Sequence, residues 1–152
     1  MVEDGAAPRG LRPGLLVVTH GGLAFELVRA LEKIVGATRN LRALSIGWDD
    51  DLHAARRSVE RAIVEVDAGG GVLILTDMFG GTATNLTLSF LRPGVEIVTG
   101  VNLPMVVKFA NLPADITVKE AAAAVKEQGQ RAIALATNYL DPSPGRDPRT
   151  GS

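Results

Sequence analysis

Residues 72–82 read Val-Leu-Ile-Leu-Thr-Asp-Met-Phe-Gly-Gly-Thr, and this stretch decides the predicted fold. Its first five residues, Val72 to Thr76, are almost wholly apolar, which is typical of a strand covered on both faces of a parallel sheet. A turn with two glycines follows, and a helical pattern then runs from Thr82 to about Phe90. The stretch therefore predicts a central strand that leads directly into a helix.

The same alternation continues on both sides of this stretch, where short apolar runs are separated by segments with helical spacing. The expected strands are Leu15 to Thr19, Leu41 to Ile46, Val72 to Thr76 and Val95 to Thr99. The expected helices are Leu23 to Val35, about Asp50 to Val66, Thr82 to about Phe90, a short helix after Pro104, and Val118 to Glu127. This order predicts a doubly wound α/β domain, with a mainly parallel four-stranded sheet flanked by helices on both faces.

Apolar spacing also predicts which helix faces are buried. The shared face consists of Leu23, Leu27, Ala30, Leu31 and Ile34 in the first helix, and of Leu52, Ala55, Val59, Ile63 and Val66 in the second. Near the end of the chain, residues Arg131 to Ala136 alternate Ile133 and Leu135 with smaller residues. This run fits either an edge strand or more helix, and the alternation favours the strand.

The composition fits one compact domain with a flexible segment at each end. A chain of 152 residues has the size of a single domain. Its terminal stretches mix charge, glycine and proline without periodicity. We therefore expect a flexible extension over residues 1–13, one domain over 14–138 and a flexible tail over 139–152.

Charge and residue usage argue against several kinds of partner. The 17 acidic residues nearly balance the 16 basic ones, so no long-range field favours nucleic acid or a membrane surface. Cysteine is absent and only two histidines occur, which excludes disulfides and thiol catalysis and argues against a metal centre. No apolar run approaches the roughly 20 residues of a membrane span. We expect a cytoplasmic protein with no cofactor and no metal.

Polar residues follow each of the four predicted strands. They form the segments Thr19 to Gly22, Ile46 to Asp49, Thr76 to Thr82 and Val101 to Pro104. In open α/β sheets, ligands and chemistry gather outside the carboxyl ends of the strands. We therefore expect His20 and Asp77, which come directly after the first and third strands, to form a reactive pair.

The imidazole of His20 acts as a nucleophile when one ring nitrogen is neutral and free. Asp77 would accept the N–H of the other nitrogen, which fixes the tautomer and stabilises the positive ring that develops. Backbone N–H groups of Gly21, Gly80 and Gly81, together with the hydroxyl of Thr82, would bind the oxygens of a transferring phosphoryl group. These residues predict phosphoryl transfer through His20.

Transfer from a nucleotide is not expected. The sequence has no G-x-x-x-x-G-K-[ST] phosphate loop, and no Arg or Lys lies inside the His20 and Asp77 segments. Backbone dipoles without a fixed cation permit transfer in both directions, so a partner protein would supply any cation.

Structural roles stay open for the same residues. His20 fits a buried histidine held by backbone groups, Asp77 fits a turn cap, and Gly80 with Gly81 fits a tight turn. The second histidine, His53, falls on the polar side of a predicted helix, and we expect it to be a solvated surface residue.

Four further residues are expected to line the crevice or to dock a partner: Trp48, Phe79, Asn102 and Pro104. Trp48 is the only tryptophan, and it fits a lid over the core and a docking surface equally well. Asn102 and Pro104 also fit turn chemistry alone.

At these residues the sequence resembles the IIA component of the mannose family of the bacterial sugar phosphotransferase system. Three motifs carry the resemblance: VVTHG from Val17 to Gly21, LTDMFGGTATN from Leu75 to Asn85, and GVNLPM from Gly100 to Met105. They occur in the family's order within a region from about residue 15 to residue 136.

The resemblance implies that His20 is phosphorylated on Nε2, that Asp77 is hydrogen-bonded to the ring, and that Thr82 lies beside the phosphoryl group. It also implies that Asn102 lies in the loop that completes the crevice. Such proteins are phosphotransferases that accept the group from the histidine phosphocarrier protein and pass it to a IIB component. They are homodimers that exchange a C-terminal strand, which here would be Arg131 to Ala136.

Two other functions stay open at this point. In the first, the chain is a stand-alone signalling module, and phosphorylation of His20 regulates a partner rather than driving sugar transport. In the second, it is a small-ligand hydrolase that uses His20 and Asp77 as a base pair, although no Ser or Cys nucleophile follows a third strand. Contact with a membrane would be indirect, through a permease complex.

Overall fold

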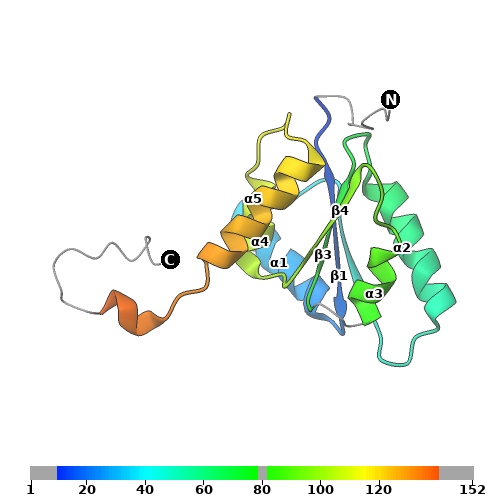
Figure 1. The fold of residues 1–152 in the computed structure, drawn as a ribbon, viewed down its shortest axis with the longest axis horizontal. Helices are drawn as coiled ribbons and strands as arrows, with labels where there is room; N and C mark the ends of the chain where they lie inside the picture. The colour runs from blue at the N-terminus through cyan, green and yellow to red at the C-terminus, as the bar shows by residue number, and fades with distance from the viewer. Residues whose placement is uncertain (1–9, 79–81, 141–152) are drawn as a thin grey trace.

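The computed structural model describes residues 10–78 and 82–140, with the side chains of residues 82 and 83 outside that description. In this part of the chain, the strands are β1 (Gly14–His20), β2 (Leu41–Ile46), β3 (Val72–Thr76) and β4 (Val95–Thr99). They form one sheet in the order β2-β1-β3-β4, and every pair is parallel. The predicted doubly wound parallel sheet is therefore confirmed (Figure 1).

Helices cover both faces of this sheet. The helices of the described residues are α1 (Leu23–Val35), α2 (Leu52–Val66), α3 (Thr82–Leu88), α4 (Leu103–Ala110) and α5 (Val118–Arg131). α1, α4 and α5 lie on one face, and α2 and α3 lie on the other (Figure 1). Right-handed crossovers of this kind place each helix against the sheet that its own strands form.

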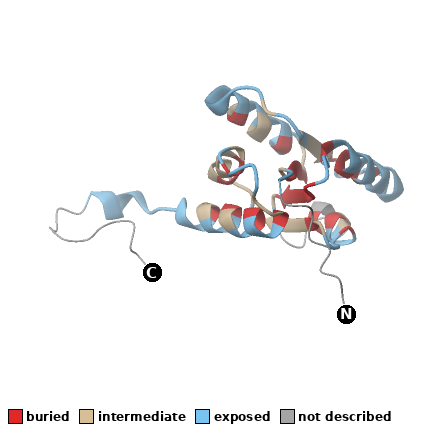
Figure 2. Cartoon of the chain, turned by 90° about the horizontal axis from the view of Figure 1, so that it is seen from above, coloured by how far each residue is buried: buried red, intermediate tan, exposed pale blue. Residues whose placement is uncertain are grey.

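β1 shows why the strands are apolar throughout. Leu15 and Val17 belong to the core that α1, α4 and α5 cover, whereas Leu16 and Val18 belong to the core under α2. All four side chains are completely buried, and the buried residues form a central layer between the helices in Figure 2. Because each such side chain contributes about 1.5 to 3 kcal/mol when it leaves water, a polar residue on either face would be costly.

Strand order reverses between β1 and β3. β1 pairs with β2 on one side and with β3 on the other. The chain therefore leaves β1 towards one edge of the sheet and returns to its other side. Val18 lies opposite Thr76 in the β1–β3 register, so the residues that follow these two strands emerge next to each other at the switch point, where open α/β sheets bind ligands.

The predicted buried faces of the first two helices are partly wrong. In α1 the side chains of Leu23 and Ile34 are exposed, while Ala24 and Leu31 are buried. The N–H of Ala24 donates to the buried hydroxyl of Thr19, which fixes how α1 meets the sheet. In α2 the first residue, Leu52, is exposed as well, because apolar spacing does not show where a helix extends past the core.

Residues Arg131 to Ala136 form no strand within the single chain, and exchange of this segment between subunits stays a prediction. α5 continues to Arg131, and a short 3₁₀ helix follows at Ala136–Tyr139. Residues 132–140, called here the C-terminal arm, are all exposed and run away from the body (Figures 1 and 2). A strand needs a hydrogen-bonding neighbour, and the arm does not reach the sheet of its own chain.

Candidate functional site

His20 and Asp77 are in direct contact at the switch point. His20 is the last residue of β1, and Asp77 directly follows β3. The ring Nδ1 of His20 lies 2.9 Å from Oδ2 of Asp77 and 3.2 Å from Oδ1, and the backbone N–H of His20 donates to Oδ2 at 3.0 Å. A carboxylate only accepts hydrogen bonds, so Nδ1 carries the proton. The structure thus brings these two residues together, and their role as a catalytic pair stays a prediction.

Buried threonines tie each of these strand ends to the helix that follows. Thr19 accepts the N–H of Ala24 at 2.7 Å. On the other strand, the hydroxyls of Thr76 and Thr84 lie 3.0 Å apart, and Thr84 donates to the carbonyl of Met78. The positions of His20 and Asp77 are therefore fixed by side chains that the sequence reasoning missed, although a threonine directly precedes each of them.

The pKa of Asp77 is lowered by its contacts with His20. Burial by itself raises the pKa of this carboxyl group, since desolvation disfavours the charged form. Hydrogen bonds from the backbone and ring of His20, the charge of that ring and the N–H of Met78 act in the opposite direction and prevail. Asp77 is therefore an ionised acceptor near neutral pH, as orientation of the ring requires.

Gly21 forms the turn between β1 and α1. Its N–H was expected to bind a phosphoryl oxygen, but it already has a hydrogen-bond partner. Its φ angle is +55°, in the left-handed region that glycine adopts without strain. The N–H of Gly21 donates to the carbonyl of Ile46 at 3.3 Å, and the hydroxyl of Ser45 donates to the carbonyl of Gly21 at 2.5 Å. Both polar groups of its backbone thus bind the end of β2, so Gly21 holds the turn rather than presenting an open N–H to a phosphoryl group.

Trp48 lies over the ring of His20. The centroids of the imidazole and indole rings are 4.9 Å apart, and the angle between the ring planes is 23°. The two rings are therefore stacked. The side chain of Trp48 is 82% exposed, whereas that of His20 is only 11% exposed. Of the two roles that the sequence leaves open, this exposure does not fit a lid over the core, and Trp48 stacks on the ring of His20 instead.

The remaining predicted site residues are placed less directly. Asn102 caps α4, because its Oδ1 accepts the N–H of Met105 at 3.2 Å, and its Nδ2 donates to the carbonyl of Gly129 at 3.1 Å. Pro104 lies in the first turn of α4. Phe79, Gly80 and Gly81 lie outside the described residues, and Thr82 is described only as the first residue of α3.

The other histidine is not part of this site. His53 is exposed in the first turn of α2, and its N–H donates to the carboxylate of Asp51 at 3.1 Å. The predicted surface position of His53 is confirmed.

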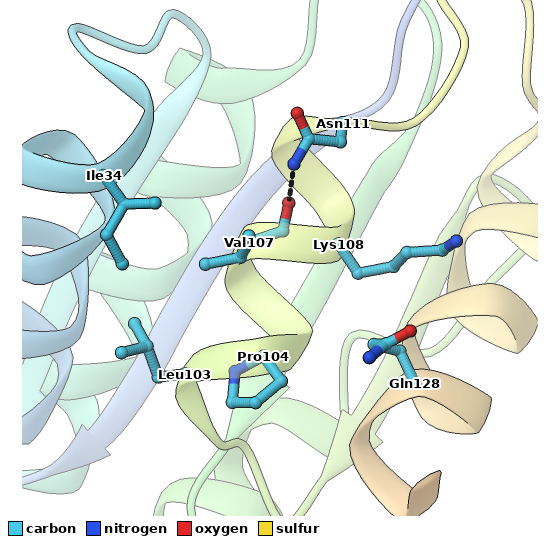
Figure 3. Close-up of a pocket in the computed structure, with 7 residues that line it drawn as sticks. All are labelled: Ile34, Leu103, Pro104, Val107, Lys108, Asn111 and Gln128. Carbon is cyan, nitrogen blue, oxygen red and sulfur yellow. Dashed lines mark hydrogen bonds between the residues drawn. The ribbon is translucent and has the colours of Figure 1, made fainter. Parts of the chain in front are cut away.

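A groove of about 570 Å³ lies elsewhere, along α4 (Figure 3). α1 contributes Ile34 and α5 contributes Gln128, while the rest of the lining comes from α4 and Asn111. Neither His20 nor Asp77 lines it. The reactive pair therefore lies outside this groove, at the rim of the sheet.

The described residues contain neither a candidate membrane span nor a candidate metal site. No helix among them is both long and apolar enough to cross a membrane. No group of three or more His, Asp or Glu residues in residues 10–78 and 82–140 is arranged to hold a metal ion.

The pair is arranged for nucleophilic chemistry at Nε2. The proton on Nδ1 leaves the lone pair of Nε2 available, and no hydrogen bond within the described residues involves Nε2. Asp77 offsets the positive charge that the ring acquires when Nε2 forms a bond. A third group such as a serine hydroxyl is not required for transfer of a phosphoryl group, which depends mainly on position and charge.

The known proteins with similar sequences are described as components of the sugar phosphotransferase system. The profile of the family described as "PTS system fructose IIA component", where PTS is the phosphotransferase system, matches residues 14–126. The PTS system fructose-specific EIIA component of Bacillus subtilis (strain 168) is 23% identical over 129 residues, which are 84% of this chain and 88% of that protein. The PTS system mannose-specific EIIAB component of Escherichia coli (strain K12) is 29% identical over 101 residues, which are 62% of this chain but only 30% of that longer protein.

Solved structures of IIA proteins have a fold similar to that of this chain. The mannose/sorbose specific IIA subunit from Enterococcus faecalis superimposes with a TM-score of 0.74 at 28% identity, over 82% of this chain and 95% of that one. The PTS IIA protein associated with the fucose utilization operon of Streptococcus pneumoniae gives a TM-score of 0.75 at 26% identity, over 88% and 99%. The likeness therefore covers most of the described chain.

Proposed function

Since this chain belongs to the IIA family of the sugar phosphotransferase system, we propose that it carries a phosphoryl group on Nε2 of His20. The observation that supports this most directly is the contact of Nδ1 with Asp77 at 2.9 Å, because it selects Nε2 as the nucleophile. Family membership gives the chain a role in phosphoryl transfer, and the geometry supports the residue that performs it.

In the proposed reaction, the donor is the histidine phosphocarrier protein, phosphorylated on its own histidine. The lone pair of Nε2 of His20 attacks phosphorus while the donor's P–N bond breaks, and the donor nitrogen leaves with the electron pair of that bond. The proton on Nδ1 stays in its hydrogen bond with Asp77. Backbone N–H groups at the start of α3 support the phosphoryl oxygens.

The proposed acceptor is a IIB component. Transfer to it reverses the same step, because its nucleophile attacks phosphorus and Nε2 of His20 leaves as a neutral ring nitrogen. The positive ring that Asp77 stabilises is thus formed in one half of the cycle and discharged in the other. This relay takes place in the cytoplasm and meets the membrane only through the permease complex.

We also propose that the chain acts as a homodimer joined by the C-terminal arm. Ile133, Leu135 and Leu140 are 79%, 66% and 79% exposed, which is unfavourable for a lone chain in water. β4 pairs with β3 on one side only, and the open edge of a strand accepts a further strand. β2 is the other edge strand of the sheet, so the arm of one subunit would add to one of these two open edges of the other.

The test is a reconstituted relay. Incubation with phosphoenolpyruvate, enzyme I and the histidine phosphocarrier protein is expected to add the mass of one phosphoryl group in an acid-labile form. His20→Ala is expected to abolish this addition, and His53→Ala, as the matched control, to leave it unchanged. Intact-mass spectrometry measures both. An unmodified wild-type chain, or labelling that persists in His20→Ala, contradicts the proposal.

Asp77→Asn tests the orienting role in the same assay. We expect slower transfer with an intact fold, by about tenfold, because a charged acceptor is replaced by a neutral one. Rapid-quench kinetics measure the rate and circular dichroism the fold. An unaltered rate rejects the orienting role of Asp77 while leaving His20 as the carrier.

A further inference from the structure

Trp48 is an unusual side chain because it is exposed and yet stacks on the ring of His20. A solvent-exposed tryptophan at 82% accessibility contributes little to the core. Its indole nevertheless stacks on His20 with a centroid distance of 4.9 Å. The contact therefore contributes little to the stability of the fold. It involves His20, the residue that the proposed reaction needs.

The loop around Trp48 is built to hold this position. On one side of Trp48, the N–H of Gly47 donates to Oδ2 of Asp50 at 2.6 Å. A side chain at position 47 would overlap the carboxylate of Asp50, which would then have to move away from the N–H of Gly47. On the other side, Asp51 caps α2 through the N–H of His53. The backbone that carries Trp48 is thus anchored at both ends.

We propose that Trp48 is a positioning residue for phosphoryl transfer, which stacks on the imidazole of His20 and stabilises the positive charge of the phosphorylated ring. This inference rests on the proposed function. Asp77 holds the ring at one edge, through Nδ1, and Trp48 holds it by one face. With an edge and a face both fixed, the direction in which Nε2 points is fixed as well.

The charge of the His20 ring changes during the reaction, and this change alters the attraction between that ring and the indole of Trp48. When Nε2 bonds to phosphorus, Nδ1 keeps its proton and the ring becomes positively charged. An aromatic face within about 6 Å attracts such a cation. Because the attraction is larger in the phosphorylated state than in the free state, Trp48 lowers the free energy of the phosphorylated protein and slows loss of the group to water.

The size of the effect follows from measured contacts of this kind. A cation over an exposed tryptophan changes an equilibrium by about two- to fivefold. Without Trp48 we expect the hydrolysis rate of phosphorylated His20 to rise by this factor, and the rate constant for transfer from the donor onto His20 to fall by a comparable factor.

The experiment compares three variants. Trp48→Phe keeps an aromatic face, Trp48→Leu keeps an apolar side chain without one, and Val64→Ala removes a 75% exposed apolar side chain from α2 as the control. Each protein is phosphorylated in the reconstituted relay and freed of its partners, and loss of the phosphoryl group is followed by mass. We expect hydrolysis about two- to fivefold faster in Trp48→Leu, and near the wild-type rate in Trp48→Phe and Val64→Ala.

Hydrolysis without partners separates positioning from docking. If Trp48→Leu hydrolyses at the wild-type rate and transfer shows only a raised KM, then Trp48 binds the partner protein and the proposal is overturned. A lowered kcat with rescue by Trp48→Phe supports positioning. A merely structural role predicts neither the rescue nor the faster hydrolysis, since all variants keep the same core.

Proton NMR of the unphosphorylated protein tests the stacking directly. The indole ring current is expected to shift the Cε1–H and Cδ2–H signals of His20 upfield, and Trp48→Leu to abolish that shift. Unchanged signals in Trp48→Leu overturn the proposal even if transfer slows. Failure of the wild type to be phosphorylated contradicts the proposed function instead, and these two failures are distinguished by the wild-type mass measurement.

Discussion

Asp77 accepts hydrogen bonds from both the backbone and the ring of one histidine. Oδ2 receives the N–H of His20 at 3.0 Å and its Nδ1 at 2.9 Å. Oδ1 also receives the N–H of Met78 at 3.0 Å. Rotation of the ring therefore breaks a charge-assisted bond, and displacement of β1 relative to β3 breaks another. A single carboxylate fixes the orientation of the ring and the closure of the strand ends.

Because of these bonds, Asp77 is expected to stabilise the fold in a pH-dependent way. Its pKa is lowered in the folded protein, relative to about 3.9 for an unfolded aspartate. The stabilisation is therefore fully present above about pH 4. It is lost as the pH falls through the folded pKa, because the unfolded chain binds the proton first.

Urea denaturation between pH 7 and more acidic conditions tests this. The difference in free energy of unfolding between wild type and Asp77→Asn is expected to be largest near neutral pH and to shrink below about pH 4. Asp115→Asn, which changes an exposed carboxylate far along the chain, serves as the control. A difference that stays constant with pH contradicts the linkage.

At the scale of the elements, the strands follow from the sequence better than the helix faces do. β2, β3 and β4 have the predicted bounds, because a parallel sheet buries both faces and leaves a clear apolar run. Helical spacing gives the period of α1 but not its rotation, which depends on the bond from Ala24 to Thr19. Local spacing also cannot show that α5 continues to Arg131.

The site shows the same limits. The contact of His20 with Asp77 was predictable because the carboxyl ends of adjacent parallel strands lie at one rim. The place of Trp48 was not, since it depends on the turn that Gly47 and Asp50 close. Thr84 was missed because its role exists only once α3 folds back on the end of β3.

Arg12 links the segment before β1 to the C-terminal end of α4. Its guanidinium donates to the carbonyls of Phe109 and Ala110 at 2.7 and 2.8 Å, and it lies over the ring of Phe109. Carbonyls in the last turn of a helix lack intrahelical partners and carry partial negative charge. Arg12 thus adds a hydrogen bond to two carbonyls at this helix end, of which that of Phe109 also accepts the N–H of Leu112 at 3.2 Å, and it joins α4 to the start of the sheet.

Arg12→Met is therefore expected to lower the free energy of unfolding by about 1 to 3 kcal/mol. The methionine keeps the apolar stem, so the loss reports the polar contacts. Arg29→Met, which removes an exposed ion pair with Glu26, is the matched control and should cost at most about 0.5 kcal/mol. If thermal or urea denaturation gives the same loss of unfolding free energy for both variants, then the hydrogen bonds of Arg12 do not stabilise the fold more than an exposed ion pair does.

At the scale of the whole molecule, we expect the domain and its arm to have separate roles. The sheet, its two helix layers and the His20–Asp77 pair all precede residue 132. We therefore expect a chain truncated after Ala132 to fold and to be phosphorylated, but to be a monomer, in contrast to the dimer that we propose for the full chain. Size-exclusion chromatography with light scattering measures the mass of each.

Point variants guard against an artefact of truncation. The double change Ile133→Asp and Leu135→Asp is expected to give monomers as well. Val64→Asp places one such charge at a similarly exposed position on α2 and should leave the proposed dimer intact. A full-length chain that is monomeric at high concentration, or a truncated chain that still dimerises, rejects the role of the arm.

The link from Asn102 to Gly129 has a consequence for the length of the arm. This bond fixes the last turn of α5 to the rim of the sheet, and a side chain at position 129 would collide with Met105. The arm therefore starts from a fixed point and cannot slide. If it pairs as a strand, inserting one residue between Ala132 and Ile133 would turn Ile133 and Leu135 to the opposite face. Insertions or deletions of two residues here should be tolerated, because they keep Ile133 and Leu135 on the same face, whereas changes of one residue should not. In that case the pairing depends on the number of residues in the arm as well as on their type.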